Sequence, residues 1–342
     1  MHSRALIAAA LVLAGVAAGP TPARAAASLP TMRSGHGITV TAEHRVDARR
    51  IDLTVTSTAV AGSHQVYVLL PEHYRPAERY PVLYLLHGAL DTPGSWLTDG
   101  DAENLTAGRP LITVIPDGGL KGWYTDWAHP RGAAPQRWET FHVDQLIPFV
   151  DDNLNTIANR RGRAIAGLSM GGFGAMRYAA RHPGLFAYAA SFSGALDLLD
   201  PAVRATIVAE ELGVVPNSGP PAAADAIFGS PLIGLDGGWR AASPVRNVAS
   251  LRGMGLAIYT GGGSITDPFS GIVESDLRGT ARAMHRSLNA AGIPHFFDDY
   301  GDGRGYGPGR CDGNHDFGCW KNDLVNVLPR LMAAVSHPRG AQ

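Results

Sequence analysis

The sequence predicts an α/β fold in which a mostly parallel central sheet is covered by helices on both faces. Two expected strands, at residues 81–86 and 111–116, are almost continuously apolar, as strands buried on both faces should be. Strand-like and helix-like segments alternate along the chain, which is typical of parallel sheets. The chain has 342 residues, of which 45% are hydrophobic and 17% charged, enough for one large domain of this class.

The individual elements follow from the periodicity of the apolar residues. Residues 37–40 and 50–55 alternate apolar and polar side chains and are expected to form antiparallel edge strands. Gly292 follows the helix predicted over 274–291, where it serves as a C-terminal stop. The remaining strands are expected at 65–70, 163–166, 186–194, 255–260 and 294–300, and the remaining helices at 138–153, 172–180 and 322–335.

The segment from 195 to 250 is rich in Ala, Pro and Gly and has poor periodicity. We interpret it as an irregular insertion over the site, within a single domain that spans residues 28–342. In parallel sheets the chemistry lies at the carboxyl ends of the strands. Functional residues are therefore expected in the loops that follow the strands at 81–86, 163–166 and 255–260.

The beginning of the chain has the features of a secretion signal. Arg4 gives a basic start, residues 5–18 form an apolar run too short for a stable membrane anchor, and residues 23–25 read Ala-Arg-Ala, a small-x-small cleavage site. Residues 1–25 are thus predicted to be a signal peptide, cleaved after residue 25 or 27, and the mature protein to be secreted. With a net charge of -1, nothing indicates a nucleic-acid partner or binding to an anionic membrane.

Cys311 and Cys319 are the only two cysteines. In a secreted protein such a nearby pair is expected to form a disulfide. The alternative is a metal site with His315, which lies midway between them, but two thiolates and one His make an incomplete zinc set. No metal and no organic cofactor is expected.

Residues 167–171 read Gly-Leu-Ser-Met-Gly, the G-x-S-x-G pattern of a nucleophile elbow. The pattern lies between an expected strand and an expected helix, the context that such an elbow needs. The turn presents the Ser169 hydroxyl and places the Met170 amide at a helix N-terminus, where a developing oxyanion can be bound. The alternative is a plain glycine-rich packing turn.

A Ser nucleophile needs a His base, and that His needs a carboxylate to fix its tautomer. In α/β-hydrolases the chain order is Ser, acid, His. His315 lies in the glycine-rich loop between the last strand and the last helix, where the base is expected. For the acid, Asp267 follows the strand at 255–260 and Glu274 begins the next predicted helix. The pattern alone leaves these two open.

The second oxyanion donor should come from the loop after the strand at 81–86. That loop reads His87-Gly88-Ala89, and the Ala89 amide is the expected donor. His87 is either a second base or a residue that packs and bonds locally.

Five segments together resemble a known family in their order and spacing. The chain resembles the esterase-D-like group of serine esterases, and specifically its antigen-85 mycolyltransferase branch, from about Val66 to the last helix. The resemblance implies an α/β-hydrolase fold and acyl transfer through an acyl-serine to a sugar, a glycerolipid or water. The matching segments are 85–88 (Leu-Leu-His-Gly), 123–127 (Trp-Tyr-Thr-Asp-Trp), 138–141 (Trp-Glu-Thr-Phe), 167–170 (Gly-Leu-Ser-Met) and 313–315 (Gly-Asn-His).

The resemblance also bears on individual residues. The acid of the mycolyltransferases is a Glu at the start of the helix after the glycine loop, which favours Glu274 over Asp267. Mycolyltransferases carry Asp where this chain has His87, Arg where it has Leu90, and Trp where it has Phe317, so trehalose is not indicated as the acceptor. These three positions, together with Trp123, are expected to line the substrate site.

The sequence therefore predicts a secreted serine esterase or acyltransferase with the triad Ser169, Glu274 and His315. The expected substrate is an acyl ester or lipid, and the acyl group passes to water or to an alcohol such as a sugar or glycerol. One alternative is a mycolyl- or diacylglycerol-type acyltransferase that acts on envelope glycolipids. An alternative of another class is a secreted binding protein without catalysis, against which the complete Ser, Glu and His set argues.

Overall fold

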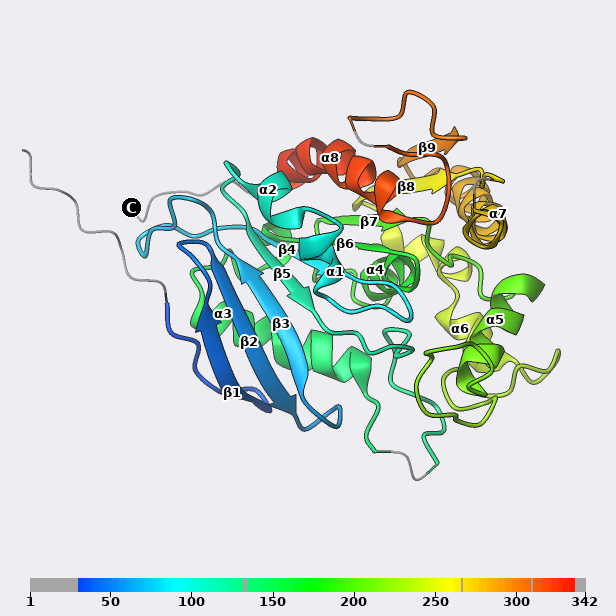
Figure 1. The fold of residues 1–342 in the computed structure, drawn as a ribbon, viewed down its shortest axis with the longest axis horizontal. Coiled ribbons are helices and arrows are strands. Elements are labelled where there is room, and N and C mark those ends of the chain that lie inside the picture. The colour runs from blue at the N-terminus through cyan, green and yellow to red at the C-terminus, as the bar shows by residue number, and fades with distance from the viewer. Residues whose placement is uncertain (1–29, 132–133, 266, 309, 336–342) are drawn as a thin grey trace, which may run out of the picture.

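The computed structural model describes residues 30–131, 134–265, 267–308 and 310–335. The predicted signal peptide lies outside the described residues. Figure 1 shows one sheet with helices packed against it. The strands are β1 (Ile38–Arg45), β2 (Arg50–Ser57), β3 (His64–Leu69), β4 (Val82–Leu86), β5 (Ile112–Pro116), β6 (Arg163–Leu168), β7 (Tyr188–Phe192), β8 (Gly255–Gly261) and β9 (Phe296–Gly301). The α-helices are α1 (Ser95–Thr98), α2 (Ala102–Thr106), α3 (Ile147–Asn153), α4 (Met170–Arg181), α5 (Pro201–Glu211), α6 (Gly237–Ala242), α7 (Pro268–Ala290) and α8 (Phe317–Ala334).

The sheet is parallel in its centre and antiparallel at one edge. Its order is β1-β2-β3-β5-β4-β6-β7-β8-β9. The first three strands pair antiparallel with one another, and β3 pairs antiparallel with β5. All pairs from β5 to β9 are parallel. The mostly parallel sheet and the antiparallel edge are thus as the sequence predicts.

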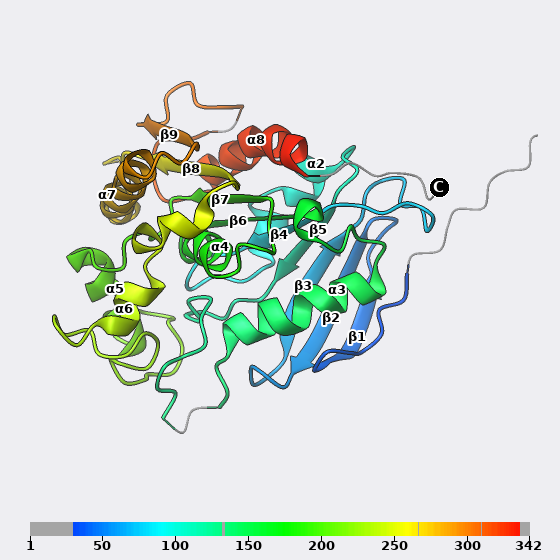
Figure 2. The ribbon, with the colours of Figure 1, turned by 180° about the vertical axis from the view of Figure 1, so that it is seen from behind.

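Two apolar cores lie on the two faces of the sheet. One contains the buried side chains of α3, α4 and α7, and the other contains those of α1, α2 and α8. Helices α1, α2 and α8 lie in front of the sheet in Figure 1, and α3 and α4 lie in front of it in Figure 2, which is seen from behind. Covering both faces explains why the central strands carry continuous apolar runs.

Helices α7 and α8 begin several residues earlier than their periodicity predicts, and in each case an Asp caps the true start. Asp267 accepts hydrogen bonds from the amides of Phe269 and Ser270, and Pro268 occupies the first position of α7. Asp316 accepts from the amides of Gly318 and Cys319 at the start of α8. Capping by Asp and a Pro at the first helical position stabilise these ends without any apolar repeat.

Other boundaries also differ from the expectation. The helix predicted over 138–153 is a π-helix, η1 (Thr140–Leu146), followed by α3. The segment 195–250 is not irregular throughout, because it contains α5, α6 and two 3₁₀ turns, η3 (Pro244–Arg246) and η4 (Val248–Leu251). Among the described residues, no helix combines the length and the apolar character needed to cross a membrane.

Candidate active site

Ser169 lies in a strained turn between β6 and α4. Its φ of 52° and ψ of -120° lie outside the regions that ordinary residues favour. The turn is tight on both sides. A Cβ at Gly171 would lie 2.5 Å from the carbonyl oxygen of Leu86, and a Cβ at Gly167 would lie 2.5 Å from the backbone of Gly171. The two glycines of the motif are therefore required by close backbone contacts, which distinguishes this turn from a loosely packed one.

The loop after β4 lies directly against Ser169. A Cβ at Gly88 would be 3.3 Å from Ser169 Cβ and 3.8 Å from its Oγ. Ala89, the next residue, is half-buried, and Met170 is fully buried at the first position of α4. Of the two residues whose amides the sequence predicts as oxyanion donors, Ala89 thus follows a glycine that packs against Ser169, and Met170 follows Ser169 directly in the chain.

His87 is fully buried, with 0% of its surface exposed, and both ring nitrogens bond to the backbone. Nε2 accepts the amide hydrogen of Gly118 at 2.8 Å, so the ring proton lies on Nδ1, which donates to the Gly88 carbonyl at 2.8 Å. A trans peptide directs its N–H opposite to its C=O. Because His87 fixes the Gly88 carbonyl, it also fixes the direction of the Ala89 N–H. His87 therefore supports the loop from inside and does not face solvent.

The Glu274 carboxylate is fully buried, and each of its oxygens has a defined partner. Oε1 accepts hydrogen bonds from Ser193 Oγ at 2.8 Å, Thr260 Oγ1 at 3.1 Å and the Gly261 amide at 2.6 Å. Oε2 lies 2.8 Å from His315 Nδ1. This arrangement puts the ring proton on Nδ1 and leaves Nε2 free to accept a proton.

Glu274 lies in the second turn of α7 and not at the start of the helix, which corrects the sequence prediction. Asp267 occupies the N-cap instead, and its carboxylate serves the first turn of α7. The structure thus pairs His315 with Glu274. Asp267 instead accepts hydrogen bonds from the amides of Phe269 and Ser270.

The His315 loop is held by three further contacts. Its backbone amide donates to Ser270 Oγ at 2.8 Å. Its ring packs edge-on against Trp320, with the ring centroids 4.8 Å apart. A disulfide joins Cys311 to Cys319 across the loop, as the cysteine spacing predicts. Among the hydrogen bonds of the described residues, none joins Ser169 Oγ to His315, and such catalytic bonds are often long when no substrate is bound.

The remaining predicted substrate residues lie in different environments. Leu90 is 37% exposed at the surface, next to the loop that carries Ala89. Trp123 is only 5% exposed, and its Nε1 donates to Glu210 Oε2 at 2.8 Å. Phe317 is half-buried and packs against Trp96 and Trp320. Of these side chains, Leu90 is the most accessible to a ligand.

One group of potential metal ligands is found within the described part of the chain. Asp312, Asp316 and Cys319 bring ligand atoms within 4.8 Å of one another. The sulfur of Cys319 is bonded to Cys311, so it cannot act as a thiolate ligand. The same disulfide uses both thiols of the zinc alternative that the sequence offers, Cys311 and Cys319 with His315, so that alternative has no thiolate ligand.

The motifs that carry most of the family resemblance form a buried polar network. Asp126 accepts from the amide and the hydroxyl of Thr140. The Glu139 carboxylate accepts a hydrogen bond from the Arg177 guanidinium at 2.8 Å and lies 2.7 Å from His182 Nε2. Burial would raise the pKa of Glu139, but His182, Arg177 and Arg181 lower it to about 2. This network fixes the second half of α4 to η1.

Sequence reasoning missed the hydroxyl groups that hold Glu274 and His315. Ser193 and Thr260 lie near the ends of expected strands and Ser270 lies before an expected helix, and no motif distinguishes them from other serines and threonines. The only available signal is that Ser193 and Thr260 lie at the carboxyl ends of β7 and β8, where functional groups gather.

The family of the chain follows from comparison with known sequences. The model of the Esterase family matches residues 57–331. This chain belongs to the Esterase family. Esterase Rv1288 of Mycobacterium tuberculosis is 35% identical over 310 residues, which are 88% of this chain and 63% of the relative. The chain thus spans less than two thirds of that esterase. Diacylglycerol acyltransferase/mycolyltransferase Ag85B of Mycobacterium leprae is 28% identical over 323 residues, which cover 90% of this chain and 91% of the relative.

Solved structures agree with the Esterase family assignment at the level of the fold. MPT51 (FbpC1) of Mycobacterium tuberculosis gives a TM-score of 0.65 at 23% identity, over 83% of this chain and 98% of that chain. An S-formylglutathione hydrolase from Agrobacterium tumefaciens also gives 0.65, at 15% identity, over 87% and 99%. The fold is therefore that of the α/β-hydrolases, as the resemblance implied.

Proposed function

We propose that this protein is a secreted serine esterase or acyltransferase that cleaves acyl esters through an acyl-serine intermediate. The observation that carries the proposal is the 2.8 Å contact between His315 Nδ1 and the buried Glu274. This contact leaves His315 Nε2 as a base, in a molecule whose one strained G-x-S-x-G turn presents Ser169. Membership of the Esterase family supports the same reading.

In the proposed reaction, Ser169 Oγ attacks the ester carbonyl carbon while His315 Nε2 takes the hydroxyl proton. The tetrahedral intermediate collapses, the ester C–O bond breaks, and His315 returns the proton to the leaving alcohol. Water or a second alcohol then attacks the acyl-serine with His315 again as the base. Glu274 holds the imidazole in its tautomer and stabilises the imidazolium that forms twice in each cycle.

The amides of Ala89 and Met170 are proposed to bind the oxyanion of both tetrahedral intermediates. Two facts support this assignment. Gly88 packs against Ser169, and His87 fixes the peptide that contains the Ala89 amide. Met170 begins α4, so its amide belongs to the free N–H groups of a helix N-terminus, where negative charge is favoured.

The acceptor is proposed to be water or an alcohol such as a sugar or glycerol. The name of the Mycobacterium leprae relative, a diacylglycerol acyltransferase/mycolyltransferase, makes transfer to an envelope glycolipid the main alternative. Leu90 places a hydrocarbon side chain at the surface beside the proposed oxyanion loop, which favours apolar over charged groups there. Acyl transfer to added glycerol or glucose that outruns hydrolysis would favour the transferase.

Secretion is proposed from the first 25 residues together with the disulfide. Disulfides persist in oxidising compartments and are rare in the cytosol. Cys311 and Cys319 are joined in the structure, which agrees with folding outside the cytosol.

Replacement of Ser169 tests the proposed function. Ser169→Ala should reduce p-nitrophenol release from p-nitrophenyl butyrate by at least about 10⁴-fold, because the covalent route is lost. Ser250→Ala, at an exposed position on η4, is the matched control and should keep wild-type activity. Activity of Ser169→Ala near the wild-type level would refute the assignment.

A further inference from the structure

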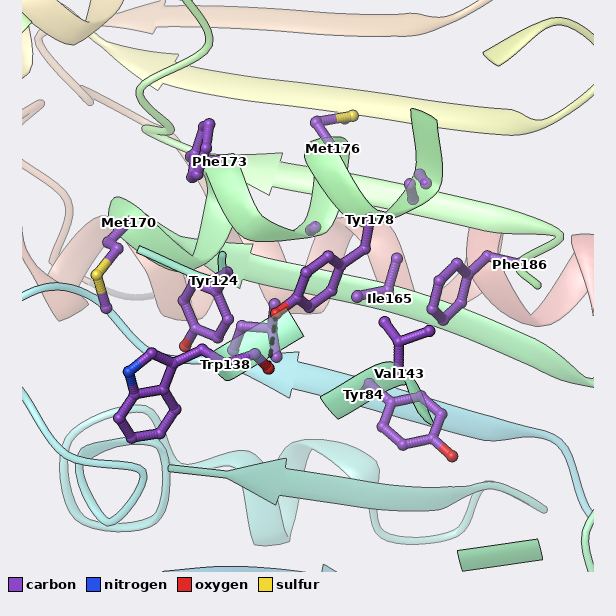
Figure 3. Packing of buried hydrophobic residues seen from close by; sticks show 14 of the residues in the cluster. Tyr84, Tyr124, Trp138, Val143, Ile165, Met170, Phe173, Met176, Tyr178 and Phe186 are labelled. Carbon is purple, nitrogen blue, oxygen red and sulfur yellow. Dashed lines mark hydrogen bonds between the residues drawn. The ribbon is translucent and has the colours of Figure 1, made fainter. Parts of the chain in front are cut away.

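Tyr124 contacts both of the segments that carry the proposed oxyanion donors. It belongs to the loop between β5 and η1, and its side chain is fully buried. Figure 3 shows it on the underside of α4, beside Tyr178. The sequence motif in which it lies, residues 123–127, otherwise has its polar members in the network of Glu139 and Arg177. Tyr124 itself is not part of that network.

On one side, the ring of Tyr124 is packed against the helix that begins with Met170. A Cβ at Gly174 of α4 would lie 2.5 Å from Tyr124 Cγ. The missing side chain at Gly174 lets the ring approach the helix axis closely. A Cβ at Gly118 would likewise lie 2.5 Å from Tyr124 Cζ and its hydroxyl oxygen. The ring is thus confined from two directions and cannot shift without moving α4 or the 118 loop.

On the other side, the hydroxyl of Tyr124 donates to the carbonyl oxygen of His87 at 3.0 Å. This carbonyl precedes Gly88, whose own carbonyl is bound by His87 Nδ1. Two successive peptides that lead to the Ala89 amide are therefore each fixed by one hydrogen bond. Burial raises the pKa of Tyr124 well above its ordinary value, so the hydroxyl keeps its proton throughout the working pH range.

The backbone at Tyr124 is strained in the way that functional loops often are. Trp123 and Tyr124 have φ values of 48° and 43°, and such left-handed residues persist only where the surroundings enforce them. The Trp123 amide contacts Met170 Sδ at 3.3 Å. The pair therefore touches the side chain of one proposed oxyanion residue and the backbone that leads to the other.

We propose that Tyr124 is a positioning residue that sets the separation and direction of the Ala89 and Met170 amides. The ring fixes the position of α4, the helix that begins with Met170. The hydroxyl fixes the loop after β4, which carries Ala89. This inference rests on the proposed function, because it assigns Tyr124 a role only if those two amides bind an oxyanion. The role is distinct from substrate binding, since Tyr124 has no exposed surface.

The direct test removes the hydroxyl and keeps the ring. In Tyr124→Phe, kcat for p-nitrophenyl butyrate should fall about tenfold with KM within twofold of wild type, less than the 10²–10³-fold cost of deleting a donor. The inhibition constant of a phenylboronic acid, whose tetrahedral Ser169 adduct needs the oxyanion donors, should rise in proportion. Tyr178→Phe is the matched control. It also removes a buried tyrosine hydroxyl, one that belongs to α4 and is bonded to Trp138 and His142 instead of to the loop after β4.

A second variant moves the ring instead of deleting its hydroxyl. Gly174→Ala should lower kcat with little change in KM, because the new Cβ displaces either Tyr124 or α4. Gly279→Ala on α7 is its control, since a Cβ there meets no atom within 4 Å. Wild-type kcat and boronate affinity in Tyr124→Phe would overturn the inference. An equal loss in Tyr178→Phe would also overturn it, by showing a general stability effect.

The failure of this inference can be told apart from failure of the proposed function. If Ser169→Ala is inactive and Tyr124→Phe behaves as wild type, only the positioning role is wrong. If Ser169→Ala remains active, the proposed function itself fails, whatever Tyr124→Phe shows.

Discussion

The proposed nucleophile and the proposed base are held in place by different means. Ser169 is set by its own backbone, since two glycines within two residues of it make the close contacts that the strained turn needs. His315 is set by two groups from a distant helix, Glu274 and Ser270 of α7. It is also held by two groups close to it in the chain, Trp320 of α8 and the disulfide that closes its loop. A local constraint is visible in five letters of sequence, whereas a constraint assembled from several segments is not.

The difference also predicts which half of the site is easier to perturb. Contacts around the elbow are mostly backbone contacts, which substitutions of neighbouring side chains leave intact. Those around His315 are side-chain contacts, each removable by one substitution. Variants on the His315 half should therefore lower activity without unfolding the protein.

Among the groups that hold His315, Glu274 is expected to have the largest effect. In Glu274→Gln, the amide oxygen should keep the three donors on the Oε1 side, so the NH₂ group faces His315 and selects the wrong tautomer. We expect kcat to fall about 10³–10⁴-fold. Asp267→Asn is the matched control and should stay within about twofold of wild type, because Asn caps helices as well as Asp. If only Asp267→Asn abolished activity, the acid would be misassigned.

An intermediate effect is expected from the disulfide. The double variant Cys311→Ser, Cys319→Ser should lose about 2.5 kcal/mol of stability by the loop-entropy relation and several-fold in kcat. Hydrogen exchange should accelerate in residues 311–320 and stay unchanged in 163–174, since the elbow does not depend on that crosslink. Equal acceleration in both segments would contradict the separation of the two halves.

The smallest effect is expected from Glu210 of α5, which accepts a hydrogen bond from Trp123. Burial raises the pKa of Glu210 to about 7, although the hydrogen bond from Trp123 and the charge of Lys121 lower it, and neighbouring Glu211 raises it further. A Glu in the unfolded chain titrates near about 4.3. The stability that protonated Glu210 contributes to the fold is therefore complete below about pH 4.3, the unfolded-chain pKa, and is lost as the pH rises through about 7.

Glu210→Gln should remove this pH dependence while it keeps an acceptor for Trp123. Urea unfolding at pH 8 should give a free energy roughly 2 kcal/mol above wild type, with little difference at pH 5. The control is Glu72→Gln, at an exposed position. A variant whose stability falls at pH 8 would show that the charged form of Glu210 is favoured in the fold.

Much of the fold follows from the sequence, because continuous apolar runs report burial on both faces. The starts of α7 and α8 are harder to predict from the sequence. Asp267 and Asp316 cap the starts of α7 and α8, and the apolar repeat of each helix begins later in the chain. The π-helical turn at Thr140–Leu146 also has no signature in simple periodicity.

The candidate site was predictable to the extent that it depends on chain order. Ser169 and His315 follow from motif and order, and Glu274 required the family resemblance. The hydroxyl partners of Glu274 were missed, since Ser193 follows β7, more than eighty residues before the carboxylate that it contacts. His87 was expected at the substrate surface, but only the structure shows its two backbone bonds and complete burial.

The most direct test of the central claim is peptide mass spectrometry after a brief exposure to p-nitrophenyl butyrate, quenched in acid. An acyl-serine mechanism predicts a butyryl group on the peptide that contains Ser169, and its accumulation in a His315→Ala variant should be much slower. Hydrolysis of the ester with no adduct on Ser169, or with the adduct on another residue, would contradict the account.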